Sequence, residues 1–115
     1  MSRILFIDDE APMLRSLQRE FSAEYDLSVA YSAAEAQALL GGPGHFDVVV
    51  SDVSMPEMNG LDFIETASPD CPDTRFVVLT GNCDTKTLER AEAMPSVSHV
   101  LLKPSSREAI LEAIG

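Results

Sequence analysis

The sequence lacks any apolar run that approaches the roughly 20 residues of a transmembrane helix. Its first residues, Met1-Ser2-Arg3, lead directly into a strand-like run. The longer apolar stretch and small-residue cleavage site of a secretory signal peptide are missing there. These absences argue against a membrane-spanning or secreted protein. We therefore predict a cytoplasmic location and no membrane partner.

Basic residues are also scarce. Lys and Arg number 8 against 19 Asp and Glu, so the formal net charge at neutral pH is −11. The chain has no basic patch or stripe that could neutralise the phosphates of a nucleic acid. The same charge disfavours binding to an anionic membrane surface. We expect no direct contact with nucleic acid.

Cysteine is rare as well. The two thiols, Cys71 and Cys83, lack the spacing of metal ligands or of a redox pair, so both are predicted to be reduced. The sequence shows no internal repeat, linker or low-complexity segment. With 115 residues, of which 45% are hydrophobic, it has the size and composition of a single domain, residues 1–115. This domain either stands alone or is a fragment of a longer protein.

What the sequence does contain is an alternation of strand-like and helix-like segments. Continuous apolar runs are typical of strands that are buried on both faces of a parallel sheet. Four such runs occur, at 4–7, 48–50, 76–79 and 100–102, and a weaker one occurs at 27–30.

Helical patterns fill the intervals between these runs. Pro12 suits the first turn of the first helix. Capping-box patterns at Ser32–Glu35 and Ser105–Glu108 predict the starts of the second and fifth helices. The third helix follows Gly60, and the fourth spans about 84–93. The residues expected to face the core are Leu14, Leu17, Phe21, Ala36, Leu39, Leu40, Leu61, Ile64, Ile110, Leu111 and Ile114. Five βα units with short connections predict an α/β fold, a doubly wound five-stranded parallel sheet with helices on both faces.

Polar residues follow the predicted strands at the points where the strands end. Asp8 and Asp9 follow the first strand, and Asp52 follows the third. The carboxyl ends of parallel strands open onto one edge of the sheet, so these three carboxylates are expected to meet. They would repel one another unless a cation lay between them, and an oxygen-rich trio suits Mg²⁺. The alternative interpretation is that these are solvated loop acids near helix N-termini.

Two further residues belong to the same edge. Lys103, before Pro104, can reach the acidic cluster and neutralise a carboxylate or bind a phosphoryl oxygen, and a cis peptide is plausible at this bond. Thr80 can donate a hydrogen bond to a phosphoryl oxygen, while Gly81 permits close backbone approach. Taken singly, Lys103 could be an ordinary solvated lysine and Thr80 an ordinary strand-end residue.

The stretch from Asp52 to Gly60, Asp-Val-Ser-Met-Pro-Glu-Met-Asn-Gly, is the most specific motif. Together with Asp8-Asp9, Thr80 and Lys103-Pro104 it resembles the receiver domain of two-component response regulators, of chemotaxis-Y-like type. All four elements occur in the family's order and spacing, and the resemblance covers essentially the whole chain. It implies a flavodoxin-like (βα)5 three-layer sandwich with strand order 2-1-3-4-5.

The resemblance also implies a role for each site residue. Asp52 would accept a phosphoryl group from a sensor histidine kinase or a phosphotransfer protein. Mg²⁺ would be bound directly by Asp9, Asp52 and the backbone carbonyl of Ser54, and by Asp8 largely through water. Lys103 would pair with Asp52 at rest and with the phosphoryl group afterwards, and Thr80 would move toward that group. The expected targets are an output domain or effector protein, with homodimerisation possible.

One position departs from the family pattern. Many receivers carry Tyr or Phe three residues before the lysine, as a switch aromatic, and this chain has Val100 there. Valine has no large rotamer swing, so the usual readout through an aromatic is in question. The neighbouring His99 is expected to point to the opposite face of the sheet and to be an ordinary histidine.

Three other functions are alternatives to this interpretation. A hydrolase resembling haloacid dehalogenase phosphatases would need an Asp at the second position after the nucleophile, where this chain has Ser54. In a flavin carrier, Asp8-Asp9-Glu10 would repel the phosphate. A degenerate receiver that acts as a phosphorylation-independent interaction module remains the alternative. The sequence therefore favours a signalling receiver that is not an enzyme beyond its own phosphorylation and dephosphorylation.

Overall fold

The computed structural model describes residues 2–55, 57–81 and 84–115. Five strands alternate with five helices and one short 3₁₀ helix, η1. The strands are β1 (Arg3–Ile7), β2 (Asp26–Ala30), β3 (Val48–Ser51), β4 (Arg75–Thr80) and β5 (Val97–Leu102). The helices are α1 (Ala11–Phe21), α2 (Ala33–Leu40), α3 (Gly60–Ala67), η1 (Ser68–Asp70), α4 (Thr85–Ala93) and α5 (Arg107–Ile114). Of the residues discussed above, Pro56 and Cys83 lie outside the described part of the chain.

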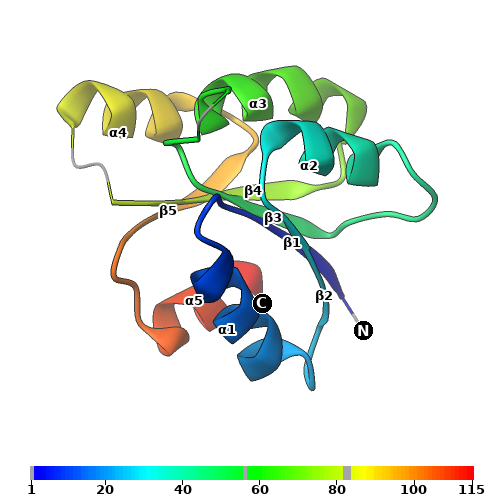
Figure 1. The fold of residues 1–115 in the computed structure, drawn as a ribbon. Coiled ribbons are helices and arrows are strands. Elements are labelled where there is room, and N and C mark those ends of the chain that lie inside the picture. Colours follow the sequence, from blue (N-terminus) through cyan, green and yellow to red (C-terminus); the bar gives the residue numbers. More distant parts are fainter. Residues whose placement is uncertain (1, 56, 82–83) are drawn as a thin grey trace.

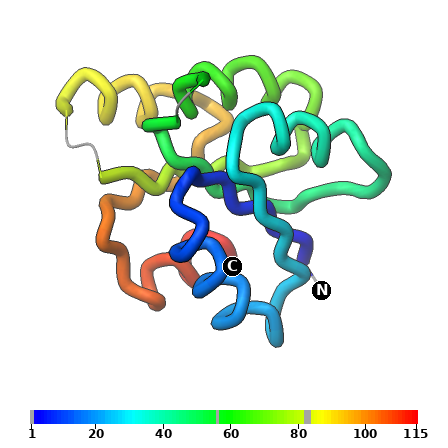
Figure 2. Tube along the Cα trace, viewed as in Figure 1, coloured from blue at the N-terminus to red at the C-terminus, as the bar shows by residue number. Residues whose placement is uncertain are grey.

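The strands form one parallel sheet in the order β2-β1-β3-β4-β5. Helices α2, α3 and α4 cover one face, and α1 and α5 cover the other (Figure 1). This arrangement confirms the doubly wound, three-layer fold. The carboxyl ends of β1, β3, β4 and β5 all lie on the left in Figure 2, so residues that follow these strands share one edge of the sheet.

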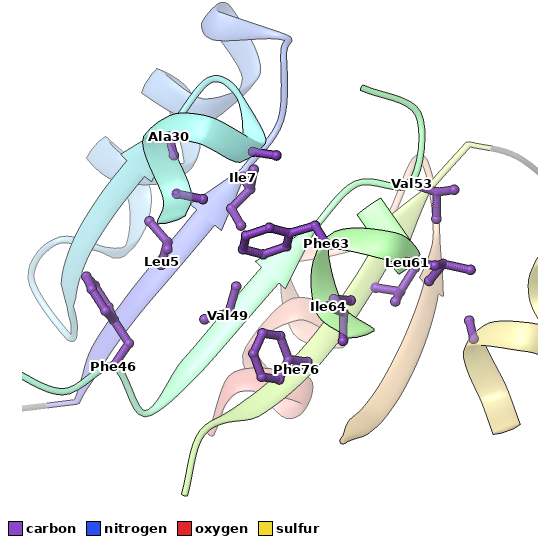
Figure 3. Close-up of a cluster of buried hydrophobic side chains, with 14 residues drawn as sticks. Leu5, Ile7, Ala30, Phe46, Val49, Val53, Leu61, Phe63, Ile64 and Phe76 are labelled. Carbon is purple, nitrogen blue, oxygen red and sulfur yellow. The ribbon is translucent and has the colours of Figure 1, made fainter. Parts of the chain in front are cut away.

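Two hydrophobic clusters fill the space between the three layers. Under α2, α3 and α4, the cluster includes Val49 of β3, Phe76 of β4, and Phe63 and Ile64 of α3 (Figure 3). The other cluster lies under α1 and α5 and includes Phe6. Successive residues of the central strands alternate between the two clusters, and both faces are buried. The continuous apolar runs of the sequence follow from this burial.

Helix starts agree with their sequence signals in most cases. Ser32 accepts a hydrogen bond from the Glu35 backbone N–H at 3.2 Å, which confirms the first capping box. At α5 the prediction was shifted by one residue, because the N-cap is Ser106, which accepts from the Ala109 N–H at 3.1 Å. The expected inward position of Leu39 was wrong. Leu39 is 38% exposed, because the short helix α2 turns its buried alanines and Leu40 toward the core instead.

The fifth strand begins earlier than its apolar run. β5 starts at Val97 and is an edge strand, paired with β4 alone. Its register with β4 is irregular between Phe76 and Val77, and its residues are at most half-buried. A half-buried edge strand does not need a continuous apolar sequence, which explains why the predicted strand starts too far along the chain. Within the described residues, no helix is long and apolar enough to cross a membrane.

Candidate functional site

Asp8 and Asp9 follow β1 but differ in exposure. The Asp8 backbone N–H donates to the Ala30 carbonyl at 3.1 Å, which continues the β1–β2 pairing one residue past the strand. Asp8 is 2% exposed, and its Oδ1 accepts from the Glu10 backbone N–H at 3.0 Å. Asp9 is exposed. Asp8 is therefore a buried carboxylate and Asp9 an accessible one.

Asp52 is held firmly at the end of β3. Its backbone N–H donates to the Ile7 carbonyl at 3.0 Å. Its Oδ1 accepts from the backbone N–H groups of Val53 at 2.8 Å and Ser54 at 3.4 Å. These contacts leave Oδ2 as the oxygen that faces Lys103, at 3.4 Å from the ammonium. The side chain is thus oriented by the backbone around it.

Gly60 is what allows α3 to start so close to Asp52. The Gly60 N–H donates to the Val53 carbonyl at 2.8 Å. A Cβ on residue 60 would lie 1.8 Å from the Asp52 carbonyl oxygen and 2.8 Å from its carbonyl carbon. No side chain fits at that separation, so the glycine is required by the close approach of two backbone segments.

The three carboxylates meet as predicted. One oxygen from each of Asp8, Asp9 and Asp52 lies within 4.8 Å of the others. An all-oxygen donor set with this spacing fits a hard divalent cation such as Mg²⁺. Burial, and then the charge of Asp8, raise the pKa of Asp52 above its ordinary value of 3.8, although Lys103 and two backbone N–H groups act in the opposite direction. Positive charge at this position would relieve the repulsion.

Lys103 reaches across the sheet edge to this cluster. Its Nζ lies 2.5 Å from Asp8 Oδ2, 3.3 Å from Glu10 Oε1 and 3.4 Å from Asp52 Oδ2. Burial disfavours the charge on Lys103, but its hydrogen bond to Asp8 and the charges of Asp52 and Asp8 outweigh this, so its pKa is raised. The expected resting contact with Asp52 is present, but the shorter contact is with Asp8.

The backbone fixes where Lys103 starts. Its N–H donates to the Thr80 carbonyl at 2.9 Å, which joins the ends of β4 and β5. The peptide bond between Lys103 and Pro104 is cis, as the sequence suggested. The ammonium is therefore placed by two neighbouring strand ends.

The remaining predicted residues lie around this centre. Thr80 ends β4 and is fully buried, and Ser54 is exposed in the loop after Asp52. Val100 pairs with Val78 and packs, half-buried, against the cluster under α2, α3 and α4. His99 is half-buried, and its Nδ1 lies 3.0 Å from Ser98 Oγ.

Sequence reasoning missed the contact between Glu10 and Lys103. The sequence pattern assigned Glu10 no role except within the acidic run that would repel a flavin phosphate. The run of three acids was the available signal, but 93 positions separate Glu10 from Lys103 in the sequence. Only the parallel sheet brings the two residues together.

A comparison with protein families decides which family this is. The model of the response regulator receiver domain matches residues 4–115. The chain belongs to the response regulator receiver family. Receiver domains of two-component systems act as signalling modules, and phosphorylation of an aspartate and Mg²⁺ binding are general for the family.

Relatives of this receiver include longer regulatory proteins. The acid tolerance regulatory protein ActR of Rhizobium meliloti is 33% identical over 114 residues, which span 96% of this chain and 57% of ActR. The transcriptional regulatory protein FlgR of Helicobacter pylori is 30% identical over 97% of this chain and 28% of FlgR. The chain therefore spans between about half and about a quarter of these curated relatives.

Solved structures of other proteins share the fold closely. A chain of an adenylate cyclase from Rhodopirellula baltica superposes with a TM-score of 0.92 at 33% identity, covering 98% of this chain and 84% of that one. A response regulator from Burkholderia pseudomallei, solved with a phosphorylated aspartic acid and a calcium ion, has a TM-score of 0.90 at 28% identity. That match covers 100% of this chain and 67% of that one.

Proposed function

We propose that this receiver accepts a phosphoryl group on Asp52 in a Mg²⁺-dependent reaction and changes its surface in response. The observation that carries the proposal is the group around Asp52: two further carboxylates, and the Lys103 ammonium, which lies 3.4 Å from Asp52 and 2.5 Å from Asp8. Phosphoryl transfer needs mainly positioning and charge neutralisation. The side chains at this edge of the sheet can supply both.

In the proposed reaction Asp52 is the nucleophile. A carboxylate oxygen attacks the phosphorus of a phosphohistidine, the P–N bond breaks, and its electron pair leaves on the imidazole nitrogen, which takes up a proton from water. Asp8, Asp9, Asp52 and the backbone carbonyl of Ser54 would hold Mg²⁺, which supplies positive charge that offsets their repulsion and that of the phosphoryl oxygens. The product is an aspartyl phosphate.

Lys103 and Thr80 would respond to the new group. Phosphorylation adds about two negative charges and three acceptor oxygens at Asp52. The Lys103 ammonium, now shared by carboxylates, would bind one of those oxygens. The Thr80 hydroxyl would bind another, and this movement would alter the loop that follows β4. Val100 would pass on less of the movement than an aromatic side chain at that position.

We further propose that residues 1–115 form one receiver domain that acts in the cytoplasm. The phosphodonor would be a sensor histidine kinase or a phosphotransfer protein. The target would be an output domain or effector, because ActR and FlgR extend well beyond the matched part. A homodimer through α4 and α5 would also fit the family pattern.

The test is phosphorylation by a small donor. With acetyl phosphate and Mg²⁺, intact-mass measurement should show a single phosphoryl adduct, mapped to Asp52 by peptide analysis. Removing the metal with EDTA should slow adduct formation at least roughly tenfold, because several kcal/mol of charge stabilisation are lost. No adduct with any donor or divalent ion would instead support a phosphorylation-independent interaction module, which the valine at position 100 favours.

Removing Lys103 should affect phosphorylation more than folding. In Lys103→Ala, adduct formation is expected to fall roughly 10–100-fold, because a preorganised charge at the transferring group is lost. With Mg²⁺ present to balance the carboxylates, we expect the Tm to change by less than about 5 °C. Lys86→Ala is the matched control, since it removes the same charge from an exposed position on α4. If Lys103→Ala mainly unfolds the protein, the role of Lys103 is structural.

A further inference from the structure

Glu10 occupies an unusual place beside the phosphorylation site. It is the N-cap residue of α1, yet its side chain makes no capping hydrogen bond. Its Oε1 lies instead 3.3 Å from Lys103 Nζ. Glu10 and Lys103 both line an open cavity of about 460 Å³ whose wall includes Met13 of α1 and Ile110 of α5. The Glu10 carboxylate therefore faces open space next to the lysine.

The charges explain why this position matters. Asp8, Asp9 and Asp52 form the group that suits a divalent cation, and Glu10 is not a member of it. A bound cation would balance that group, whereas the Glu10 charge would still face the solvent. The side chain is exposed, so the charge is screened but not removed. A phosphodonor that arrives from this side meets a negative charge before it reaches Lys103.

We propose that Glu10 is a specificity-determining residue for the phosphodonor. It holds the Lys103 ammonium on the outer side of the site, where it competes with an incoming phosphoryl group, and its charge disfavours free dianionic donors. The competition slows every donor, and the repulsion adds a further penalty for small dianionic donors over donors whose phosphoryl group is attached to a protonated nitrogen. The inference rests on the proposed phosphorylation of Asp52 and assigns a preference to that same site.

Two small phosphodonors that differ in net charge but give the same product can test this preference. Acetyl phosphate is a dianion at neutral pH; when Asp52 attacks its phosphorus, the P–O bond breaks and acetate leaves with the electron pair. Phosphoramidate carries one net negative charge because its nitrogen is protonated. In that case the P–N bond breaks and ammonia leaves with the electron pair. Both reactions give the same aspartyl phosphate, so any difference between them reports on the donor.

The experiment compares initial rates of adduct formation for the native sequence and Glu10→Gln, with Mg²⁺ and each donor in turn. We expect Glu10→Gln to accelerate phosphorylation by acetyl phosphate about two- to fivefold, the range of an exposed ion pair. Phosphorylation by phosphoramidate should accelerate less, so the ratio of the acetyl phosphate rate to the phosphoramidate rate should rise in Glu10→Gln. High salt should shrink the difference, because exposed charges are screened.

Two matched variants test whether the charge of Glu10 beside Lys103 is responsible for the change in donor ratio. Glu57→Gln removes one negative charge from the exposed loop after β3, and Glu57 is not among the carboxylates that contact Lys103, so the donor ratio should stay unchanged. Glu10→Asp keeps the charge on a shorter side chain, so its ratio should stay closer to the native ratio than that of Glu10→Gln. Circular dichroism should show the same fold for all of them.

The outcomes are distinct. If no protein forms an adduct, the proposed function fails. If all are phosphorylated but Glu10→Gln leaves the donor ratio unchanged, or slows both donors, the proposed phosphorylation stands and the role of Glu10 is overturned. An equal change in Glu57→Gln would also overturn it, because net charge rather than contact with Lys103 would then be responsible.

Discussion

Replacing Asp52 with asparagine is expected to abolish phosphorylation while making the metal-free protein more stable. The amide is not a nucleophile, so no phosphoryl adduct should form with acetyl phosphate and Mg²⁺, a loss of more than about 10³-fold. The amide oxygen can still accept from the backbone N–H groups of Val53 and Ser54, which hold Oδ1 now. The loop geometry should therefore survive the substitution.

The stability gain follows from the raised pKa of Asp52. Burial and the charge of Asp8 disfavour the ionised carboxylate in the folded state. The ionised group consequently destabilises the fold above the ordinary pKa of 3.8, and this cost disappears as the pH falls and the group takes up a proton. An asparagine removes the cost at neutral pH. We therefore expect the Tm of the metal-free protein to rise in Asp52→Asn.

The measurements are intact mass for the adduct and thermal unfolding in EDTA, at pH 7 and near pH 4. The Tm of Asp52→Asn should exceed that of the native sequence by less at the lower pH. Mg²⁺ should raise the Tm of the native sequence more than that of the variant, because the variant has lost one carboxylate ligand. An adduct that persists in Asp52→Asn would place the phosphoacceptor elsewhere. An unchanged Tm would show that the buried charge is already balanced without metal.

Replacing Gly60 with alanine should be the most destabilising single change at the site. The new Cβ would lie 1.8 Å from the Asp52 carbonyl oxygen, and its nearest neighbours are all backbone atoms, so a side-chain rotation cannot relieve the clash. Overpacking of this kind typically costs about 1–3 kcal/mol, occasionally more. We expect the upper end, which corresponds to a Tm lower by roughly 10–20 °C.

The same substitution should impair the chemistry, because relief of the clash moves Asp52 itself. Gly42→Ala is the control: its Cβ would lie 3.4 Å from the nearest atom, so the free energy of unfolding should change by less than about 1 kcal/mol. Chemical denaturation and the rate of adduct formation would be measured for both. A Gly60→Ala protein as stable and as active as Gly42→Ala would contradict the close approach of α3 to Asp52.

Sequence patterns predicted the fold well where burial is complete. The central strands β1, β3 and β4 are buried on both faces, and their apolar runs located them within a residue or so. The prediction was poorer at β5, where the edge position and an irregular register leave a mixed sequence. It was also poorer for Leu39 on α2, since an eight-residue helix needs few apolar positions to attach to the sheet.

By itself, the sequence determined which chemical groups gather at the sheet edge. Parallel strands with right-handed crossovers bring their carboxyl ends together, so Asp8, Asp9, Asp52, Thr80 and Lys103 could be assigned to one site before any coordinates. Only the tertiary structure decided how they share charge: Lys103 lies closer to Asp8 than to Asp52 and also contacts Glu10. The physical reason is that the alternation of buried strands and helices depends on hydrophobic pattern, which is visible in sequence. Contacts of 2.5 to 3.4 Å depend instead on the path of each loop backbone, which Gly60 and the pairing of Lys103 with Thr80 fix in three dimensions.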